Sequence, residues 1–239
     1  MSDAAPRPAE PHDPSINARL NALRAAVLGA NDGIVSTAGL VMGVAGATND
    51  RGTIAVAGLA GLVAGAMSMA AGEYVSVSTQ RDTERALIAQ ESRELREAPE
   101  DELAELARLY EHKGLSPTLA HDVAAELTAV DPLRSHLEVE LGIDPDDLTN
   151  PWHAAWASMA SFVVGAALPL LTILLFPADL RAPLTVIAVG VALAGTGYTA
   201  ARAGGAPPQR AVLRNVAGGL LAMGITYGVG TVVGGAGLV

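Results

Sequence analysis

The residue in this chain with the clearest chemical potential is an acid inside an apolar run. Between Arg24 and Asp50 the only charge is Asp32, and the run is long enough to cross a bilayer core of about 30 Å as a helix. A carboxylate inside a membrane helix is costly unless it is neutralised, paired or close to water, so such acids mark pathways for ions or protons. The alternative is that Asp32 caps a shorter helix beginning after it. The helix-permissive run Ala25–Ala30 favours the membrane acid.

A second apolar run, Thr53–Val77, carries Met69 and Glu73. Only the short segment 49–52 separates the two runs, so they are predicted to form an antiparallel helical hairpin. Counting from the ends that face the same side, Asp32 and Met69 both lie about 10 to 12 Å deep. Glu73 follows Met69 by one helical turn on the same face.

A carboxylate and a thioether at one depth suggest a particular class of ion. Oxygen ligands alone suit Mg2+ or Ca2+, whereas an added soft sulfur ligand favours first-row transition metals such as Fe2+. The sequence therefore predicts a transport path formed by Asp32, Met69 and Glu73. The alternative for Met69 is that its flexible side chain only fills a packing gap.

Residues 78–150 contain a second concentration of metal-ligating side chains. This region holds 18 of the 25 acidic residues of the chain and 7 of its 15 Lys and Arg residues. The rest of the chain, with 7 acidic and 8 basic residues, is nearly neutral. Such an acidic region attracts cations and repels nucleic acid and anionic lipid. Its candidate metal ligands are two Glu pairs at i, i+3 spacing and a His-Glu pair at i, i+4 spacing: Glu91, Glu94, Glu102, Glu105, His136 and Glu140. The alternative is an ordinary solvated helix face.

The elements that position these residues are all predicted to be helices. Residues 1–21 are predicted to be a disordered tail, residues 22–77 form spans one and two, residues 78–150 form an inserted helical domain with a modest core, and residues 151–239 form spans three to five. Within the inserted domain, proline and glycine place helix boundaries at Pro99, Gly114, Pro117, Pro132 and Gly142. The later spans are predicted over 153–176, 183–201 and from 216 onward. Glycine pairs that permit close helix contact recur at 29/33, 39/43, 61/65, 224/228 and 230/234.

Arginine placement orients the five spans. Arginines cluster before span one and between spans four and five, which predicts a cytosolic N-terminus, a cytosolic acidic domain and a C-terminus outside. The chain has no cysteine, so disulfides, thiolate metal sites and thiol redox chemistry are excluded. Its single lysine among 15 basic residues indicates a GC-rich bacterial genome, and hence the plasma membrane.

Four motifs are distinctive: Asn31-Asp32-Gly33-Ile34-Val35-Ser36-Thr37, Ser68-Met69-Ala70-Ala71-Gly72-Glu73-Tyr74-Val75-Ser76-Val77, Gln80-Arg81-Asp82 and Glu138-Val139-Glu140-Leu141-Gly142. Together they resemble the vacuolar iron transporter family over nearly the whole chain.

The resemblance implies a five-span homodimer whose first helices line an iron path at the two-fold axis, with Fe2+/H+ antiport out of the cytosol. The family's pathway acid and methionine match Asp32 and Met69. Its metal-domain glutamates match Glu91, Glu94, Glu102, Glu105 and, across a gap, Glu140. The chain departs from the plant pattern where His136 and Leu137 replace metal-binding methionines, which leaves the metal preference of the domain open.

The leading hypothesis is a proton-coupled transporter of Fe2+ or Mn2+, with Zn2+ and Co2+ as further candidate substrates and no tightly bound cofactor. Asp32 or Glu73 would carry the counter-proton, and the partners would be metal ions, protons, membrane lipid and a second copy of the chain. The alternative is a membrane-anchored metal buffer or sensor, which would not need Asp32. A ferritin-like di-iron oxidase would need Glu-x-x-His motifs on facing helices, and the acidic domain has none, so we do not expect an enzyme.

Overall fold

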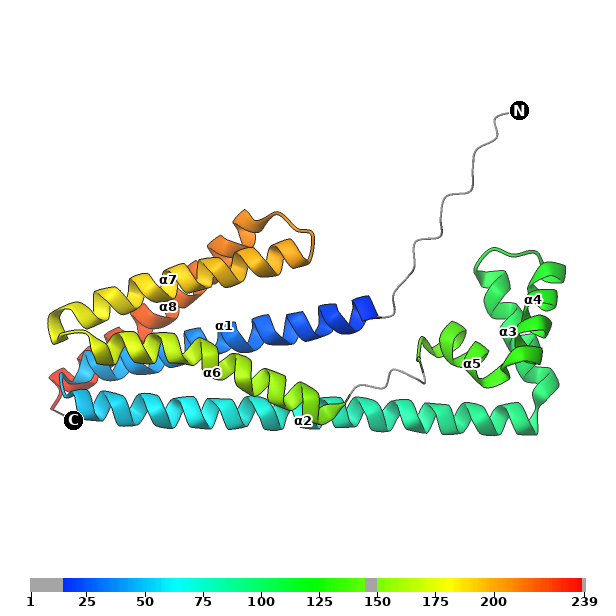
Figure 1. The fold of residues 1–239 in the computed structure, drawn as a ribbon, viewed down its shortest axis with the longest axis horizontal. Helices are drawn as coiled ribbons and strands as arrows, with labels where there is room; N and C mark the ends of the chain where they lie inside the picture. The colour runs from blue at the N-terminus through cyan, green and yellow to red at the C-terminus, as the bar shows by residue number, and fades with distance from the viewer. Residues whose placement is uncertain (1–14, 145–149, 238–239) are drawn as a thin grey trace, which may run out of the picture. The chain divides into compact units, whose positions relative to one another are not determined.

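The computed structural model describes residues 15–144 and 150–237, with side chains from residue 25 onward. Every regular element within these ranges is a helix, so the all-helical prediction is confirmed (Figure 1). The elements are α1 (Ser15–Ala47), α2 (Arg51–Glu97), α3 (Pro99–His112), α4 (Pro117–Val130), α5 (Pro132–His136), the π-helix η1 (Leu137–Leu141), α6 (Pro151–Leu175), α7 (Ala178–Ala203) and α8 (Pro208–Gly235).

Among the described residues, five helices are long and apolar enough to cross a membrane. They are α1 from Ala25 onward, α2, α6, α7 and α8, which confirms the five predicted spans of a multi-pass membrane protein. Two spans begin five or more residues earlier than predicted: α7 starts at Ala178 and α8 at Pro208. Helix α8 begins at Pro208 because proline is favoured at the first position of a helix, where its missing N–H would have no partner.

The N-terminal part of the chain differs from the sequence prediction in two ways. Asp32 lies well inside α1, so the alternative in which Asp32 caps a shorter helix is wrong. Helix α1 begins at Ser15, so residues 15–21, which were predicted to belong to the tail, are helical. Residues 1–14 of that predicted tail lie outside the described part of the chain.

The chain divides into two compact units. The membrane unit comprises residues up to Glu73 and from Trp152 onward, and the acidic unit comprises Tyr74–Pro151. Helix α2 contributes its apolar first part to the membrane unit and its polar second part to the acidic unit.

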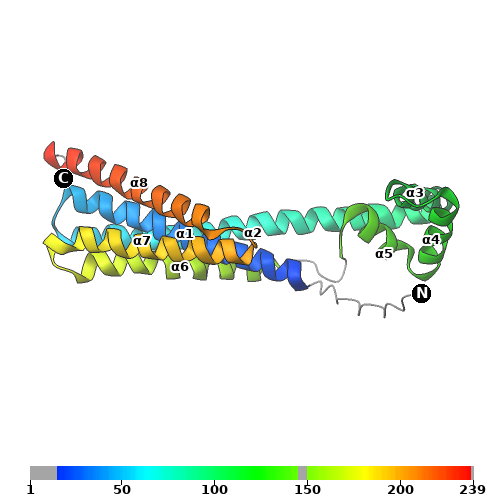
Figure 2. The same ribbon diagram turned by 90° about the horizontal axis from the view of Figure 1, so that it is seen from above.

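In the membrane unit, α1 packs against both α7 and α8 (Figures 1 and 2). The main core consists of large apolar side chains from all five helices: Ile34, Val41, Met42, Ile54, Leu170, Ile173, Val189, Leu193 and Met223. A smaller cluster joins Phe162 and Ala166 of α6 to Ala66 of α2, with Met69 packed against it. The hairpin of α1 and α2 is therefore held on one side by α6.

Glycines allow the closest helix contacts in this unit. A Cβ atom added at Gly33 would collide with the backbone carbonyl oxygen of Phe162, and one added at Gly230 would collide with that of Gly43. Because these neighbours are backbone atoms, they cannot move aside as a side chain would. The predicted pair 224/228 differs, since an added Cβ there would meet nothing within 4 Å. Glycine spacing alone does not reveal which pairs form contacts.

Polar contacts fix the loop between α1 and α2 to the start of α7. Arg181 is 3% exposed, and its guanidinium donates to the Asn49 side-chain oxygen at 2.9 Å and to the Asn49 backbone oxygen at 3.3 Å. Asp50 accepts from the Thr53 backbone N–H at 2.6 Å, which caps the first turn of α2. These contacts hold the hairpin turn in place.

The acidic unit is a small helical assembly with the modest core that the sequence predicts. Leu106 and Ala107 of α3 and Ala124 of α4 are buried together, with Leu103, Tyr110 and Val139 packed around them. Proline follows the end of α2 and begins α3, α4 and α5, as expected. The predicted helix after Pro132 is interrupted, because residues 137–141 adopt a π-helix that ends at Gly142, where φ is +64°.

Candidate functional site

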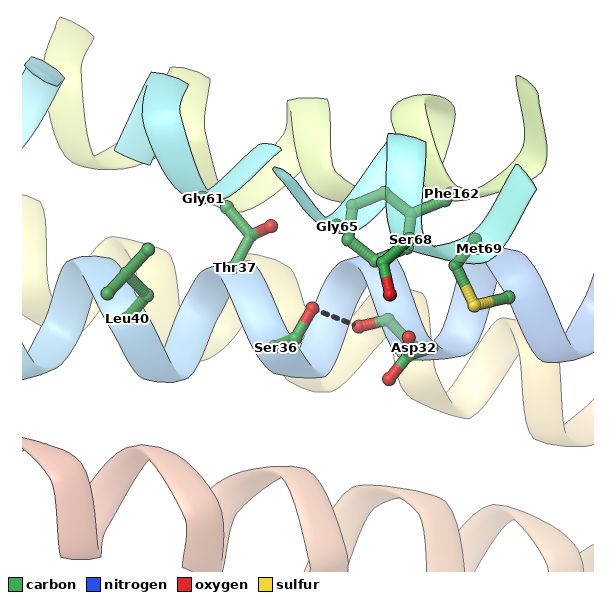
Figure 3. Close-up of a pocket in the computed structure, with 9 residues that line it drawn as sticks. All are labelled: Asp32, Ser36, Thr37, Leu40, Gly61, Gly65, Ser68, Met69 and Phe162. Carbon is green, nitrogen blue, oxygen red and sulfur yellow. Dashed lines mark hydrogen bonds between the residues drawn. The ribbon is translucent and has the colours of Figure 1, made fainter. Parts of the chain in front are cut away.

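A cavity of about 200 Å³ lies between α1 and α2 in the membrane unit (Figure 3). Its wall combines carboxylate, hydroxyl and thioether groups with small and apolar residues: Asp32, Ser36, Thr37, Leu40, Gly61, Gly65, Ser68, Met69 and Phe162. The glycines belong to α2 and leave the space that side chains would otherwise fill. An added Cβ at Gly65 would collide with the Phe162 ring, and one at Gly61 with Leu40.

The structure brings two of the predicted path residues, Asp32 and Met69, to this cavity. Asp32 is exposed in the single chain rather than enclosed by its helices. Met69 is half-buried and packs against the Phe162 cluster, so it has a packing role as well as a place in the cavity wall. Glu73, one turn further along α2, is half-buried and is not among the residues that line this cavity.

Three hydroxyl residues of the cavity were not singled out from the sequence. Ser36 follows Asp32 by one turn, and its Oγ donates to the Asp32 backbone oxygen at 2.6 Å. Thr37 is 2% exposed, and its Oγ1 has no hydrogen-bond partner among the described residues. Ser68 precedes Met69 on α2. Helical spacing from Asp32 would have found Ser36, because the position four residues ahead lies near the same face. Thr37, five residues ahead, is rotated by about 140° from Asp32 around the helix, so this spacing does not find it.

Asn31, the residue before Asp32, forms a polar contact on α1 that the sequence analysis also missed. Its Oδ1 accepts hydrogen bonds from Thr196 Oγ1 of α7 and Asn215 Nδ2 of α8, both at 3.3 Å. Amide and hydroxyl groups inside a helix bundle stabilise it when they pair with each other. This contact fixes α1 to α7 and α8 at the level of Asp32, and with it the rotation of α1.

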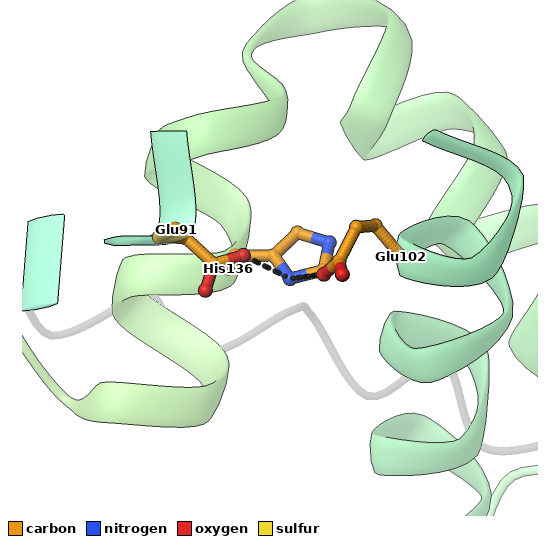
Figure 4. A group of neighbouring side chains, drawn as sticks. All are labelled: Glu91, Glu102 and His136. Carbon is orange, nitrogen blue, oxygen red and sulfur yellow. Dashed lines mark ion pairs between the residues drawn. The ribbon is translucent and has the colours of Figure 1, made fainter. Parts of the chain in front are cut away.

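The acidic unit contains a buried cluster of one histidine and two glutamates (Figure 4). Glu91 comes from α2, Glu102 from α3 and His136 from α5, and they are 4%, 9% and 0% exposed. His136 Nδ1 lies 2.9 Å from Glu91 Oε1 and 3.7 Å from Glu102 Oε2. Glu140 of η1 adds a further carboxylate, with its Oε2 3.5 Å from the same nitrogen. Four of the predicted ligands therefore converge on one point.

The contact between His136 and Glu91 is short but does not have the geometry of a hydrogen bond. Within the described part of the chain, both His136 ring nitrogens and Glu91 Oε1 lack a hydrogen-bond partner. Buried polar atoms are rarely left unpaired, because each unpaired group costs about 1 to 3 kcal/mol. A histidine nitrogen and a carboxylate oxygen at this distance, without hydrogen-bond geometry between them, are arranged as two ligands of one cation are. One ligand atom from each of Glu91, Glu102 and His136 lies within 4.8 Å of the others.

The electrostatics of the cluster favour a bound cation. Glu91 lies in the polar part of α2, beyond the apolar run, and burial raises its pKa from 4.5 to about 7, with further contributions from the charges of Glu140, Glu102, Glu94 and Glu105. Burial also raises the pKa of Glu102, with Glu105 as the next cause. A divalent cation would relieve both the burial cost and the repulsion between carboxylates.

The remaining predicted ligands surround this centre rather than forming it. Glu94 is half-buried and accepts a hydrogen bond from Gln90 at 3.1 Å. Glu105 is half-buried on α3, one turn after Glu102. Both raise the pKa of Glu91 or Glu102, so they share the electrostatic environment of the cluster. The fully buried position of His136 could not be read from the sequence, where His136 is only a neighbour of Glu140 in helical spacing.

Comparison with known proteins shows similarity to a family of iron transporters. The model of the VIT family matches residues 23–231. A protein of Acanthamoeba castellanii named vacuolar iron transporter is 43% identical over 209 residues, covering 87% of this chain and 77% of that protein. Vacuolar iron transporter homolog 1 of Oryza sativa subsp. japonica is 38% identical, covering 89% of this chain and 74% of its own length. Vacuolar iron transporter homolog 2.1 of Arabidopsis thaliana is 37% identical, covering 90% and 82%.

Proposed function

We propose, from the premise that this chain belongs to the VIT family, that it transports divalent iron across a membrane. The observation that carries the proposal is the cavity between two membrane helices that contains both Asp32 and Met69. A carboxylate and a thioether are a ligand pair for first-row transition metals, so Fe2+ is the leading substrate and Mn2+, Zn2+ and Co2+ are further candidates.

In the proposed mechanism, Asp32 receives the ion and Met69 provides selectivity for softer metals over Mg2+ and Ca2+. Exchange for protons would keep the acids of the path neutral after the ion leaves, because an acid in a membrane helix is costly to leave ionised without a cation. Asp32 in the cavity and Glu73, one turn further along α2, are the acids that would carry the counter-proton.

The active form is proposed to be a homodimer with the path at its interface. Asp32 and Ser36 are exposed in the single chain, and the apolar neighbours Leu28 and Leu40 on the same face of α1 are 62% and 39% exposed. An ion path needs walls on all sides. A second copy of this face would supply the wall that the single chain lacks.

The acidic unit is proposed to collect metal for the path. Its ligands would be Glu91, Glu102 and His136, with Glu140 close by and Glu94 and Glu105 contributing charge. This cluster by itself would also suit a membrane-anchored metal buffer or sensor. A membrane-anchored metal buffer or sensor would not need an acid in its membrane helices. The presence of Asp32 there therefore favours the transporter.

The proposed orientation places the N-terminus and the acidic unit in the cytosol and the C-terminus outside, which follows from the arginines that flank the spans. With metal collected on the cytosolic side, transport would run out of the cytosol. The proposed location is the plasma membrane, whereas the names of the relatives refer to the vacuole.

Reconstitution into liposomes with an internal metal indicator and an internal pH dye tests the proposal. We expect anaerobic Fe2+ uptake with simultaneous proton movement in the opposite direction. Replacing Asp32 with Asn should abolish both signals while leaving metal binding by the acidic unit intact, because the change removes charge with little change in volume. Metal binding without any flux in the parent protein would favour the buffer, and flux of at least half the parent rate in the Asn variant would disprove the path assignment.

A further inference from the structure

Thr37 has a buried hydroxyl group that the mechanism above does not use. The residue is 2% exposed, and no residue in the described ranges forms a hydrogen bond with its Oγ1. In helices, a Ser or Thr hydroxyl ordinarily donates to a carbonyl oxygen about one turn earlier. Ser36 and Thr185 of the same unit do so, at 2.6 Å and 2.7 Å. Among the described residues of the five apolar helices, Thr37 has the only fully buried hydroxyl without a partner.

The Thr37 side chain lies in the wall of the cavity that contains Asp32 and Met69. Figure 3 shows it extending from α1 toward α2, close to Gly61. On the α2 side the wall is formed there by Gly61 and Gly65, which have no side-chain polar group to offer the hydroxyl. The unpaired oxygen is therefore enclosed beside a part of the cavity wall that offers it no polar partner.

Thr37 lies close to the middle of the membrane-spanning part of α1. At 1.5 Å per residue, Thr37 lies about 7.5 Å beyond Asp32, about 18 Å from Ala25 and about 15 Å from Ala47. It is therefore close to the middle of the first span, which runs from Ala25 to Ala47. A cation suffers its greatest loss of hydration at this depth, so oxygen ligands are most valuable there.

We propose that Thr37 Oγ1 is a ligand of the divalent cation at a second position along the path, which the ion occupies after leaving Asp32 and Met69. This inference rests on the proposed transport function. A hydroxyl is a neutral, weaker ligand than a carboxylate, so it stabilises the ion at the midplane without trapping it. Conduction needs successive sites that are each weak enough to release the ion.

The first test compares Thr37→Val, which removes the hydroxyl at nearly constant volume, with Thr37→Ser, which keeps it. In liposomes loaded for Fe2+ uptake, the Val variant should lower the maximal rate about fivefold or more, with little change in the metal concentration that gives the half-maximal rate. The Ser variant should restore most of the rate.

Thermal unfolding separates this role from a structural one. Since the Thr37 hydroxyl is buried without a partner, the Val variant should unfold at a temperature equal to or above that of the parent. A variant that is more stable and also slower is the expected result. Parent-like flux in the Val variant, or a joint loss of flux and stability that Ser does not rescue, would overturn the inference.

A second test does not depend on flux. The chain contains no cysteine, so Thr37→Cys introduces a single thiol. Ala38→Cys is a matched control, because Ala38 is 0% exposed and belongs to the apolar core rather than to the cavity wall. Both positions are equally buried, so a difference in their reaction with a small cationic methanethiosulfonate reports access through the cavity.

We expect Thr37→Cys to react, Ala38→Cys to remain unmodified, and anaerobic Fe2+ to slow the reaction of Thr37→Cys about fivefold or more. Equal reactivity of both thiols, or no protection by Fe2+, would reject Thr37 as an ion contact even if the parent transports iron. Protection by Fe2+ in a parent that shows no flux would instead reject the proposed transport and leave the ion contact in place.

Discussion

Replacing Glu91 with Gln should stabilise the acidic unit in the absence of metal. Glu91 is 4% exposed, and burial together with neighbouring carboxylates raises its pKa from 4.5 to about 7. This difference corresponds to about 3 kcal/mol of unfavourable ionisation in the folded state. Gln has the same shape without the charge, and its buried amide group, which lacks a full set of hydrogen bonds, costs about 1 kcal/mol. We therefore expect a net gain of about 2 kcal/mol at about pH 8.

The sign of the pH dependence follows from the same shift. Between pH 4.5 and about 7 the folded state binds more protons at Glu91 than the unfolded state does. The free energy of unfolding of the parent should therefore fall as the pH rises through this window, and the penalty should be complete above it. The Gln variant should lack this contribution, so the two proteins should have similar stability in acid and differ most at alkaline pH.

Hydrogen exchange of the full chain in detergent, with a chelator present, measures this stability locally. After correction for intrinsic exchange, amides of α3 and α4 should be more protected in Glu91→Gln than in the parent at about pH 8. Glu126→Gln is the matched control, because Glu126 is exposed on α4, and it should change stability by less than about 0.5 kcal/mol. Lower protection in Glu91→Gln at alkaline pH, or a free energy of unfolding of the parent that does not change with pH, would show that burial of ionised Glu91 does not destabilise the acidic unit.

Met69→Leu, close in volume, should reduce Fe2+ flux in liposomes more than it reduces thermal stability; an equal loss of Mg2+ and Fe2+ flux would show that the thioether does not select. Converting Glu91, Glu94, Glu102 and Glu105 together to Gln should remove metal binding by the acidic unit in calorimetry of the full chain and slow transport only at low metal; undiminished binding would show that these glutamates do not bind the metal. Gly33→Ala should lower the unfolding temperature, because its Cβ collides with the Phe162 backbone oxygen. In Gly224→Ala the Cβ meets nothing within 4 Å, so a gain of up to about 1 kcal/mol is expected, and similar shifts in both variants would contradict the packing described.

Local sequence features determined most of the fold. Long apolar runs specify membrane helices by their length and composition alone, so the five spans were predictable. Proline and glycine act on their own backbone, which is why the starts of α3, α4 and α5 and the end of α2 were found within a residue or two. The π-helix after His136 was not predicted, because its hydrogen-bond pattern depends on packing around it and not on residue type.

The candidate site divides in the same way. Residue type and spacing were sufficient to predict Asp32, Met69 and the glutamate pairs as candidate metal ligands. Helical periodicity shows which residues of one helix lie on the same face. Contacts between helices were beyond the sequence, since they depend on which glycines allow close approach and on how each helix is rotated. The tertiary structure therefore decided that His136 is the buried centre of the acidic cluster. It also decided that Asp32 faces an uncovered side of its own chain and that the Thr37 hydroxyl lacks a partner, because burial and hydrogen bonding are properties of the packed chain and not of its order.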